Sequence, residues 1–211
     1  MKTLMKDMHP TKSHLIEAVS TYLDGHQGQD PCSDQVLLLS GISKGSMYHH
    51  FQDFSELIEM TRIFRFSKYI DHAVDGFKDA LSLGGTKDDV RSRFLETVKN
   101  RQTIDDKRQR TETAHLLSLS IHHRQLGSVL AKEQERLTQR YADLYAQCVD
   151  MGYADKNLDP RSISVLLQSI TWGRIVDDIS LVQMKNEEWS SIIMNLLDHT
   201  FFGSNSSQTA S

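Results

Sequence analysis

Apolar residues recur at three- and four-residue spacing through most of this 211-residue chain. This spacing predicts amphipathic helices, because every third or fourth residue faces the same side of a helix. One example is the stripe Leu15, Ile16, Val19, Tyr22 and Leu23, which is followed by the glycine-rich breaker DGHQGQDP. No segment alternates with a period of two for long enough to indicate a strand, and the chain has only three prolines. We therefore predict an all-α fold.

Two short helices are expected around a tight turn in the first quarter of the chain. Ser33 is predicted to cap the first helix, Gly41 to make the turn and Ser43 to cap the second helix, KGSMYHH. Met47 and Phe51 lie four residues apart and are expected to point inward. Two short helices joined by a glycine turn, the second with exposed polar groups, form a helix-turn-helix.

Caps and breakers place the later helices. A capping-box variant at Thr86 and Asp89 follows the break at Gly84 and Gly85. Asp159 and Pro160 form a strong start signal, because a cap is followed by proline at the first helical position. The helices expected besides the one after Thr86 are a long one through Leu57 and Phe66, one capped by Asp105 or Asp106, one from Gly127 to Gly152, one from Asp159 to about Leu181, and one from Asn186 or Glu187.

The second short helix carries side chains suited to DNA. A recognition helix enters the major groove with its N-terminal residues near the base edges. Lys44 and the helix N-terminal amides suit phosphates, and Gly45 allows a close approach of the backbone. The remaining predicted DNA contacts are Ser33, Ser43, Ser46, Tyr48, His49 and His50.

Composition limits the class of protein. Hydrophobic residues make up 38% and charged residues 25%, which is typical of a folded globular chain. A formal net charge of -4 argues against a general nucleic-acid coat protein but not against a local DNA-reading surface. No apolar run is long enough to span a bilayer and the N-terminus lacks a signal-peptide pattern, so we expect a cytoplasmic protein without a membrane partner. Cys32 and Cys148 are expected to be reduced thiols.

Residues 12 to 57 resemble the DNA-binding domain of TetR-type bacterial transcription regulators. The resemblance is carried by LIEAVSTYL, then VLLLSGISKGSMYHHF, then Glu56 and Leu57. It implies a homodimer that binds a double-stranded DNA operator and releases it when a small-molecule effector binds. It also implies a DNA-binding domain over residues 1–53 and a helical effector-binding and dimerisation domain over 54–203. The small polar residues at the end of the chain predict a disordered tail over 204–211.

Two departures from the family pattern concern the DNA-binding domain. Phe54 stands where family members usually carry a phosphate-binding lysine, and VLLLSG replaces both alanines of the family's Ile-Ala-x-x-Ala-Gly pattern. Leu38 in this segment is expected to be either exposed or unusually packed. Residues 1–55 also hold four lysines and no arginine against six acidic residues, a net of -2. This charge weakens the electrostatic case for DNA binding, because phosphate neutralisation supplies much of the affinity.

The C-terminal half supplies candidates for a ligand site and a dimer interface. His115, Tyr145 and Trp172 are candidates to line a ligand cavity, although a tryptophan on a long helix is more often part of the core. The helix predicted from Asp159 and the last predicted helix both have apolar faces too wide for one small domain to cover. Such uncovered apolar surface indicates an interface. The predicted interface residues are Ile163, Leu166, Ile170, Gly173, Ile192, Ile193 and Leu196.

Catalytic and cofactor motifs are not evident. The sequence contains no GxSxG, GxGxxG, GxxxxGK or HExxH pattern, so we predict no enzyme, no cofactor and no metal site. Two other classes of protein remain open. One is an all-α enzyme or carrier that retains a helix-turn-helix, and the other is a protein-interaction module whose acidic first domain binds a partner in place of DNA.

Overall fold

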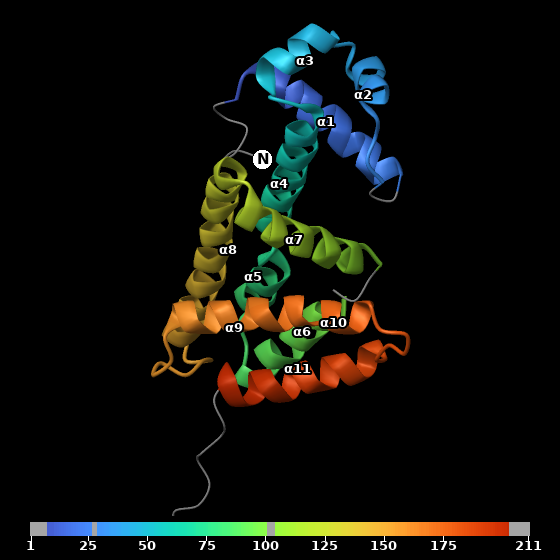
Figure 1. Cartoon of the computed structure of the whole chain (residues 1–211). Coiled ribbons are helices and arrows are strands. Elements are labelled where there is room, and N and C mark those ends of the chain that lie inside the picture. The colour runs from blue at the N-terminus through green and yellow to red at the C-terminus, as the bar shows by residue number, and fades with distance from the viewer. Residues whose placement is uncertain (1–7, 27–28, 101–103, 203–211) are drawn as a thin grey trace, which may run out of the picture. The chain divides into compact units, whose positions relative to one another are not determined.

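The structure is a computed structural model that describes residues 8–26, 29–100 and 104–202. The predicted all-α fold is confirmed: these residues form eleven α-helices and no strand (Figure 1). The helices are α1 (Pro10–Gly25), α2 (Ser33–Ser40), α3 (Lys44–His50), α4 (Phe54–His72), α5 (Asp75–Ser82), α6 (Lys87–Asn100), α7 (Ile104–His122), α8 (Arg124–Asp150), α9 (Pro160–Gly173), α10 (Ile175–Asp178) and α11 (Asn186–Thr200).

The chain packs into two compact units. The first contains residues up to Asp71 together with residues 112–133, and the second contains residues 72–111 and 134 onward. The boundaries fall near the end of α4 and inside α7 and α8, so both units share these long helices. The predicted boundary between a DNA-binding domain and an effector domain concerns function, which this structural division does not test. That boundary stays a prediction. The tail predicted over 204–211 lies outside the described residues.

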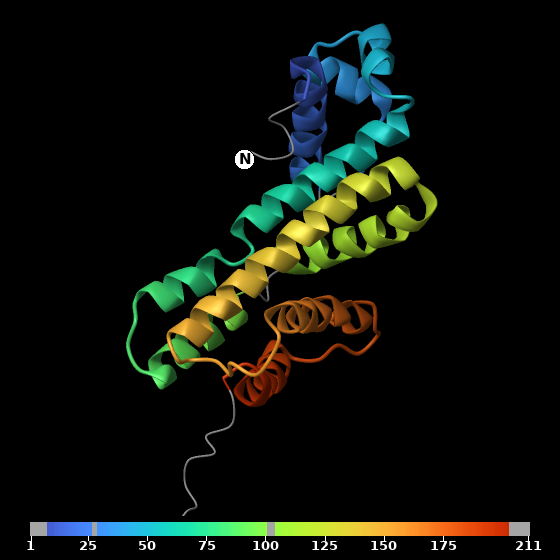
Figure 2. The same cartoon turned by 90° about the vertical axis from the view of Figure 1, so that its left-hand side faces the viewer.

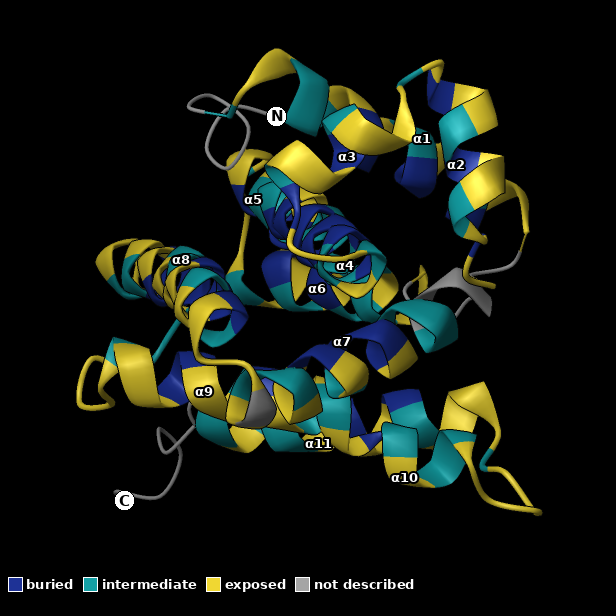
Figure 3. Ribbon diagram, turned by 45° about the horizontal axis from the view of Figure 1, so that its top comes forward, coloured by how far each residue is buried: buried dark blue, intermediate teal, exposed yellow. Residues whose placement is uncertain are grey.

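The first unit is built around the apolar stripe predicted for the first helix. Leu15, Ile16, Val19 and Leu23 of α1 are fully buried, as are Met47 of α3 and several residues of α4. Helix α1 packs against both α2 and α3. In Figure 3 the helices of this unit combine dark-blue buried residues with yellow exposed ones, as expected for amphipathic helices. Burial of such side chains stabilises a fold by about 1.5–3 kcal/mol each.

The junction of α7 and α8 completes the first unit. Helices α7 and α8 meet at residue 123, and α8 begins at Arg124, three residues before the start predicted at Gly127. A Cβ atom added to Gly127 would lie 2.8 Å from the backbone oxygen of Ser120, which is closer than real contacts allow. Figure 2 shows the turn that joins the two helices. Gly127 is therefore a residue inside the first turn of α8 whose lack of a side chain allows close packing against Ser120. The sequence alone does not distinguish such a glycine from one that precedes a helix.

The second unit has an aromatic core. The ring of Phe94 in α6 lies 5.1 Å from that of Phe77 in α5 and 5.9 Å from that of Phe201, which follows α11. Phe201 also meets the ring of Tyr145 in α8 edge-on at 4.9 Å. Helices α5 and α6 pack together, and α6 packs against α11. Edge-to-face aromatic packing of this kind adds about 0.5–1.5 kcal/mol per pair beyond area burial.

Several predicted helix starts are confirmed. Thr86 and Asp89 form the predicted capping box, in which the Thr86 amide donates to Asp89 at 2.8 Å and the Asp89 amide donates to Thr86 at 3.2 Å. Asp159 caps α9 by accepting from the Ser162 amide at 2.8 Å. Bonds from the Ser162 hydroxyl and amide hold the pKa of Asp159 below its usual value.

One predicted helix is too long. Helix α9 ends at Gly173, and residues 175–178 form the separate short helix α10, whereas the sequence predicts one helix to about Leu181. Arg174, between the two, is buried, donates to Asn186 Oδ1 at 2.6 Å and lies over the ring of Trp189, 5.6 Å from its centre. The bend at this point brings the guanidinium to partners in α11, which no local signal in the sequence specifies.

Candidate nucleic-acid interface

The helix-turn-helix predicted from the sequence is present as α2, a turn at Gly41 and α3. Gly41 has a φ of 65°, a left-handed conformation that favours glycine, and its amide donates to Leu37 O at 3.0 Å. The cap predicted at Ser33 is wrong. Cys32 is the N-cap of α2, and its amide donates to Gln35 Oε1 at 2.8 Å, so Ser33 is the first helical residue.

Helix α3 is fixed at both ends. The predicted cap at Ser43 is confirmed, because its hydroxyl accepts from the Ser46 amide at 3.2 Å. Met47 and Phe51 are 0% and 2% exposed, as predicted, and they anchor the helix to the core of the first unit. Buried anchors on one side leave the opposite side of α3 to solvent. The local sequence therefore decides which face of α3 is available to a partner.

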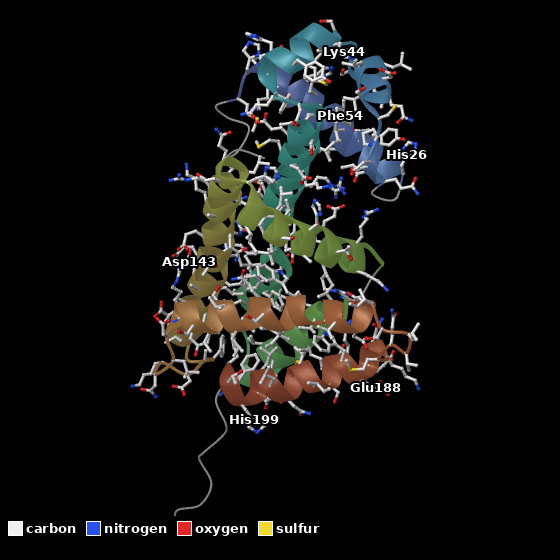
Figure 4. All side chains as sticks on the ribbon, viewed as in Figure 1. His26, Lys44, Phe54, Asp143, Glu188 and His199 are labelled. Atoms are coloured by element: carbon white, nitrogen blue, oxygen red, sulfur yellow. The ribbon has the colours of Figure 1, made fainter. Side chains whose placement is uncertain are left out.

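The available face carries most of the predicted DNA contacts. Lys44, Gly45 and His49 are exposed, and Tyr48 is 45% exposed. Figure 4 labels Lys44 on α3. A Cβ atom added to Gly45 would meet nothing within 4 Å, so the backbone is open to a close approach there. The half-buried members of the predicted set are Ser33, Ser46 and His50.

Two further basic residues, missed by the sequence reasoning, lie beside the C-terminal end of α3. His9 caps α1 by accepting from the Thr11 amide at Nδ1, and its ring lies 4.6 Å from that of His50. The ring of His49 lies 5.2 Å from that of His50. Lys12 places its Nζ 4.7 Å from the centre of the Phe51 ring. The sequence signal for His9 was its place before Pro10, since a cap commonly precedes a proline at the first helical position.

The acidic residues of this region are partly neutralised by α4. Arg62 pairs with Asp30 at 2.7 Å, and Arg65 pairs with Asp24 at 2.6 Å. Asp53 accepts from the Glu56 amide at 2.8 Å at the start of α4. The net charge of the whole unit stays at -2, because residues 1–71 hold seven basic and nine acidic residues and residues 112–133 hold two of each. The arginines of α4 therefore neutralise Asp24 and Asp30 locally without making the unit basic.

The exposed leucines of α2 agree with the departure seen in the sequence. Leu38 is 85% exposed and Leu39 is 58% exposed. Isolated exposed leucines are common in folded proteins and need no special function. The first of the two alternatives for Leu38 is thus observed: its side chain is exposed and adds nothing to the core.

The three predicted ligand-site residues lie in different surroundings. His115 belongs to the first unit, where its Nε2 lies 3.2 Å from both carboxylate oxygens of Glu59. Tyr145 and Trp172 belong to the second unit. Tyr145 is fully buried and its hydroxyl donates to Asp155 O at 2.6 Å, and burial, followed by the nearby Asp155 and Cys148, raises its pKa to about 12. Trp172 is half-buried. A ligand role for these residues remains a prediction.

The seven predicted dimer-interface residues fall into two groups. Two are buried inside the chain, and they are Ile163 and Ile193. Five keep exposed surface, and they are Leu166, Ile170, Gly173, Ile192 and Leu196. Buried side chains have no surface to offer a second copy, so only the five that are exposed or half-buried can contribute to a dimer interface. Helical periodicity identified the apolar stripes, but only the packing of the chain shows which of their residues are buried and which remain exposed.

The described residues form neither a candidate metal site nor a membrane-spanning helix. Across residues 8–26, 29–100 and 104–202, no group of three or more His, Cys, Asp or Glu side chains is placed to hold a metal ion. Within the same ranges, no helix has the length and apolar character needed to cross a bilayer. Cys32 and Cys148 are both free, and burial raises the pKa of the Cys148 thiol to about 12.

Comparisons with known proteins find similarity in fold but not in sequence. No family model matches the chain, and no curated protein matches it. A Rhodococcus protein provisionally assigned to the TetR family of transcriptional regulators is similar, with a TM-score of 0.61, 18% identity and coverage of 90% of this chain and 98% of that one.

Two other solved structures are similar to the same extent. A Mesorhizobium loti protein with the same provisional assignment has a TM-score of 0.66, 12% identity and coverage of 93% of this chain and 96% of that one. A Saccharomonospora viridis protein provisionally described as a transcriptional regulator, solved in complex with choline, has a TM-score of 0.61, 11% identity and coverage of 90% and 96%. The geometry of α1 to α3 and these structures lead to the same result: this chain has the fold of the TetR-type transcription regulators.

Proposed function

We propose that the protein is a DNA-binding transcription regulator that reads an operator with α3. The observation that carries this proposal is the exposed face of α3, which presents Lys44, Gly45 and Tyr48 to solvent. The same helix is held in place by the cap at Ser43 and by the buried side chain of Met47. An anchored helix with polar groups on its free face is what major-groove reading requires. The regulators of the same fold support the proposal.

The finer parts of the function extend this proposal. We propose repression that a small molecule relieves, because the helices beyond α4 provide a second unit in which a ligand can bind. The choline complex of the Saccharomonospora viridis protein supports a small-molecule site in a protein of this fold. Relief of repression then requires the ligand to bind one of two conformations more tightly than the other.

We also propose that the protein acts as a homodimer. The exposed apolar surface of α9 and α11, from Leu166 and Ile170 to Ile192, supports pairing of these helices across a two-fold axis. Gly173 supports a close crossing, because nothing lies within 4 Å of a Cβ added there. A symmetric dimer places two recognition helices roughly 34–36 Å apart, so the operator should be a near-palindrome.

DNA binding is tested with the promoter DNA of neighbouring genes and with variants of α3. Tyr48→Ala should weaken binding to the operator, since a base contact contributes about 1–3 kcal/mol, and should affect random DNA less. Lys44→Ala should weaken binding to all sequences and flatten the dependence on salt. Both affinities are measured by fluorescence anisotropy over a range of salt concentrations.

The matched control is Lys132→Ala, which removes the same charge from an exposed position on α8 of the same unit. It should leave DNA affinity unchanged. Operator binding by Tyr48→Ala equal to that of the unchanged protein would show that α3 does not read the bases. If no promoter fragment and no random duplex is bound, the enzyme, carrier or protein-interaction alternatives replace the proposal.

A further inference from the structure

Three histidines and a lysine gather where α1 begins and α3 ends. The ring of His50 lies 4.6 Å from that of His9 and 5.2 Å from that of His49. Lys12, on the first turn of α1, lies over Phe51, the residue that ends α3. The two helices pack against each other, so the four basic residues form one group, which we call the basic cluster.

The role of His9 is fixed by its hydrogen bond. Its Nδ1 accepts from the Thr11 amide at 3.2 Å, so the neutral ring carries its proton on Nε2. The Nε2–H is then the group that His9 can offer to a phosphate oxygen.

His50 is the group poised to take up a proton. Lost hydration, followed by the neighbouring His9, His49 and Lys12, holds the pKa of His50 below its usual value. Every charged or titratable group in that list is basic, whether it lies on α1 or on α3. The neutral form of His50 is therefore favoured in the free protein. A phosphate placed there would favour the imidazolium and raise the pKa.

We propose that His9, Lys12, His49 and His50 form a phosphate-binding clamp beside α3 whose affinity for duplex DNA rises as the pH falls. This inference rests on the proposed DNA-binding function and adds its regulation by protons. The pKa of His50 is higher with DNA bound than without, so binding takes up a proton. The gain in affinity is complete below the pKa of the free protein and is lost as the pH rises through the pKa of the complex.

The test uses a fluorescein-labelled duplex of random sequence, because phosphate contacts dominate non-specific binding. Dissociation constants are measured from pH 8 to about pH 6 at fixed ionic strength. Each histidine that takes up a proton should tighten binding by up to about tenfold per pH unit. The double variant His49→Gln, His50→Gln should show a flatter pH profile. Lys12→Gln should bind more weakly at pH 8, and its gain in affinity should begin at a higher pH, because Lys12 helps to lower the pKa of His50 in the free protein.

His26→Gln is the matched control, because His26 follows the other end of α1, where its Nδ1 lies 2.9 Å from Tyr22 O. Figure 4 labels His26 apart from Lys44 of α3. This variant should keep the wild-type pH profile. A second measurement uses only the wild-type protein, so it does not require any variant to fold. The nuclear magnetic resonance signal of the His50 ring is titrated with and without the duplex, and it should report a higher pKa with DNA.

The outcomes separate the two claims. DNA binding with no dependence on pH, a double variant with the wild-type profile, or an unshifted His50 pKa would each overturn the clamp and leave the proposed function standing. If no duplex is bound at any pH, the proposed function and the clamp both fail.

Discussion

The helix-turn-helix contains glycine at two positions for different physical reasons, and alanine substitutions should distinguish these reasons. Gly41 has a φ of 65°, whereas Gly45 lies inside α3 with nothing within 4 Å of an added Cβ. Gly41→Ala should lower the free energy of unfolding by roughly 1–2 kcal/mol, because a side chain is strained in the left-handed region. Gly45→Ala should not lower it, since alanine is the better helix former by about 1 kcal/mol. Urea unfolding measures both changes.

The same pair also distinguishes folding from binding at the residue scale. Gly45→Ala should weaken DNA binding although the protein stays as stable as the wild type, because the added methyl group occupies the open space on the exposed face of α3. Equal DNA affinities for Gly45→Ala and the wild type would mean that the backbone does not approach DNA at this position. Anisotropy with the same duplex decides it.

At the scale of helices, Arg65 joins α1, α4 and α7. Its guanidinium donates to Asp24 at 2.6 Å, to Ser20 O at 3.3 Å and to Glu112 at 3.3 Å. Glu112 is buried, so Arg65→Met would leave its charge unpaired and should lower the free energy of unfolding by about 3 kcal/mol. Adding Glu112→Leu should restore most of the loss, because no buried charge then remains without a partner and the Asp24 side chain, which also loses Arg65, is exposed to solvent. Urea unfolding of the two variants tests this.

An exposed ion pair provides the control for Arg65. Arg161 contacts Glu135 at 2.6 Å and 2.8 Å, but both side chains are more than half exposed. Arg161→Met should leave the free energy of unfolding unchanged within error, because solvent screens such pairs. If Arg65→Met and Arg161→Met have equal effects, the burial of Glu112 is not what makes the Arg65 pair important.

At the scale of the whole molecule, the proposed dimer depends on the outer edge of α9 and α11. Ile192 is 54% exposed, and Ile192→Glu or Gly173→Arg would place a charge in the proposed seam. Each variant should sediment as a monomer, keep its helical circular dichroism and lose operator binding. Leu38→Glu, at an exposed leucine of α2, should remain dimeric. A wild-type protein that sediments as a monomer at micromolar concentration would rule out both the dimer and the palindromic operator.

The sequence by itself determined the features that depend on neighbours along the chain. Helical spacing gave the all-α fold, and the caps at Ser43, Thr86 and Asp159 were placed correctly because a cap bonds to an amide two or three residues away. Gly41 was placed as the turn for the same reason. The helix-turn-helix was predictable because spacing and turn chemistry alone define it.

Only the tertiary structure decided what meets across the chain. It ended α9 at Gly173, paired Arg62 and Arg65 with acids of the first helices, and brought His9 beside His50. It also separated buried Ile193 from exposed Ile192, which are adjacent in sequence and equally apolar. An apolar stripe wider than one contact surface does not specify its partner. That choice depends on side chains far away in the sequence, which periodicity does not describe.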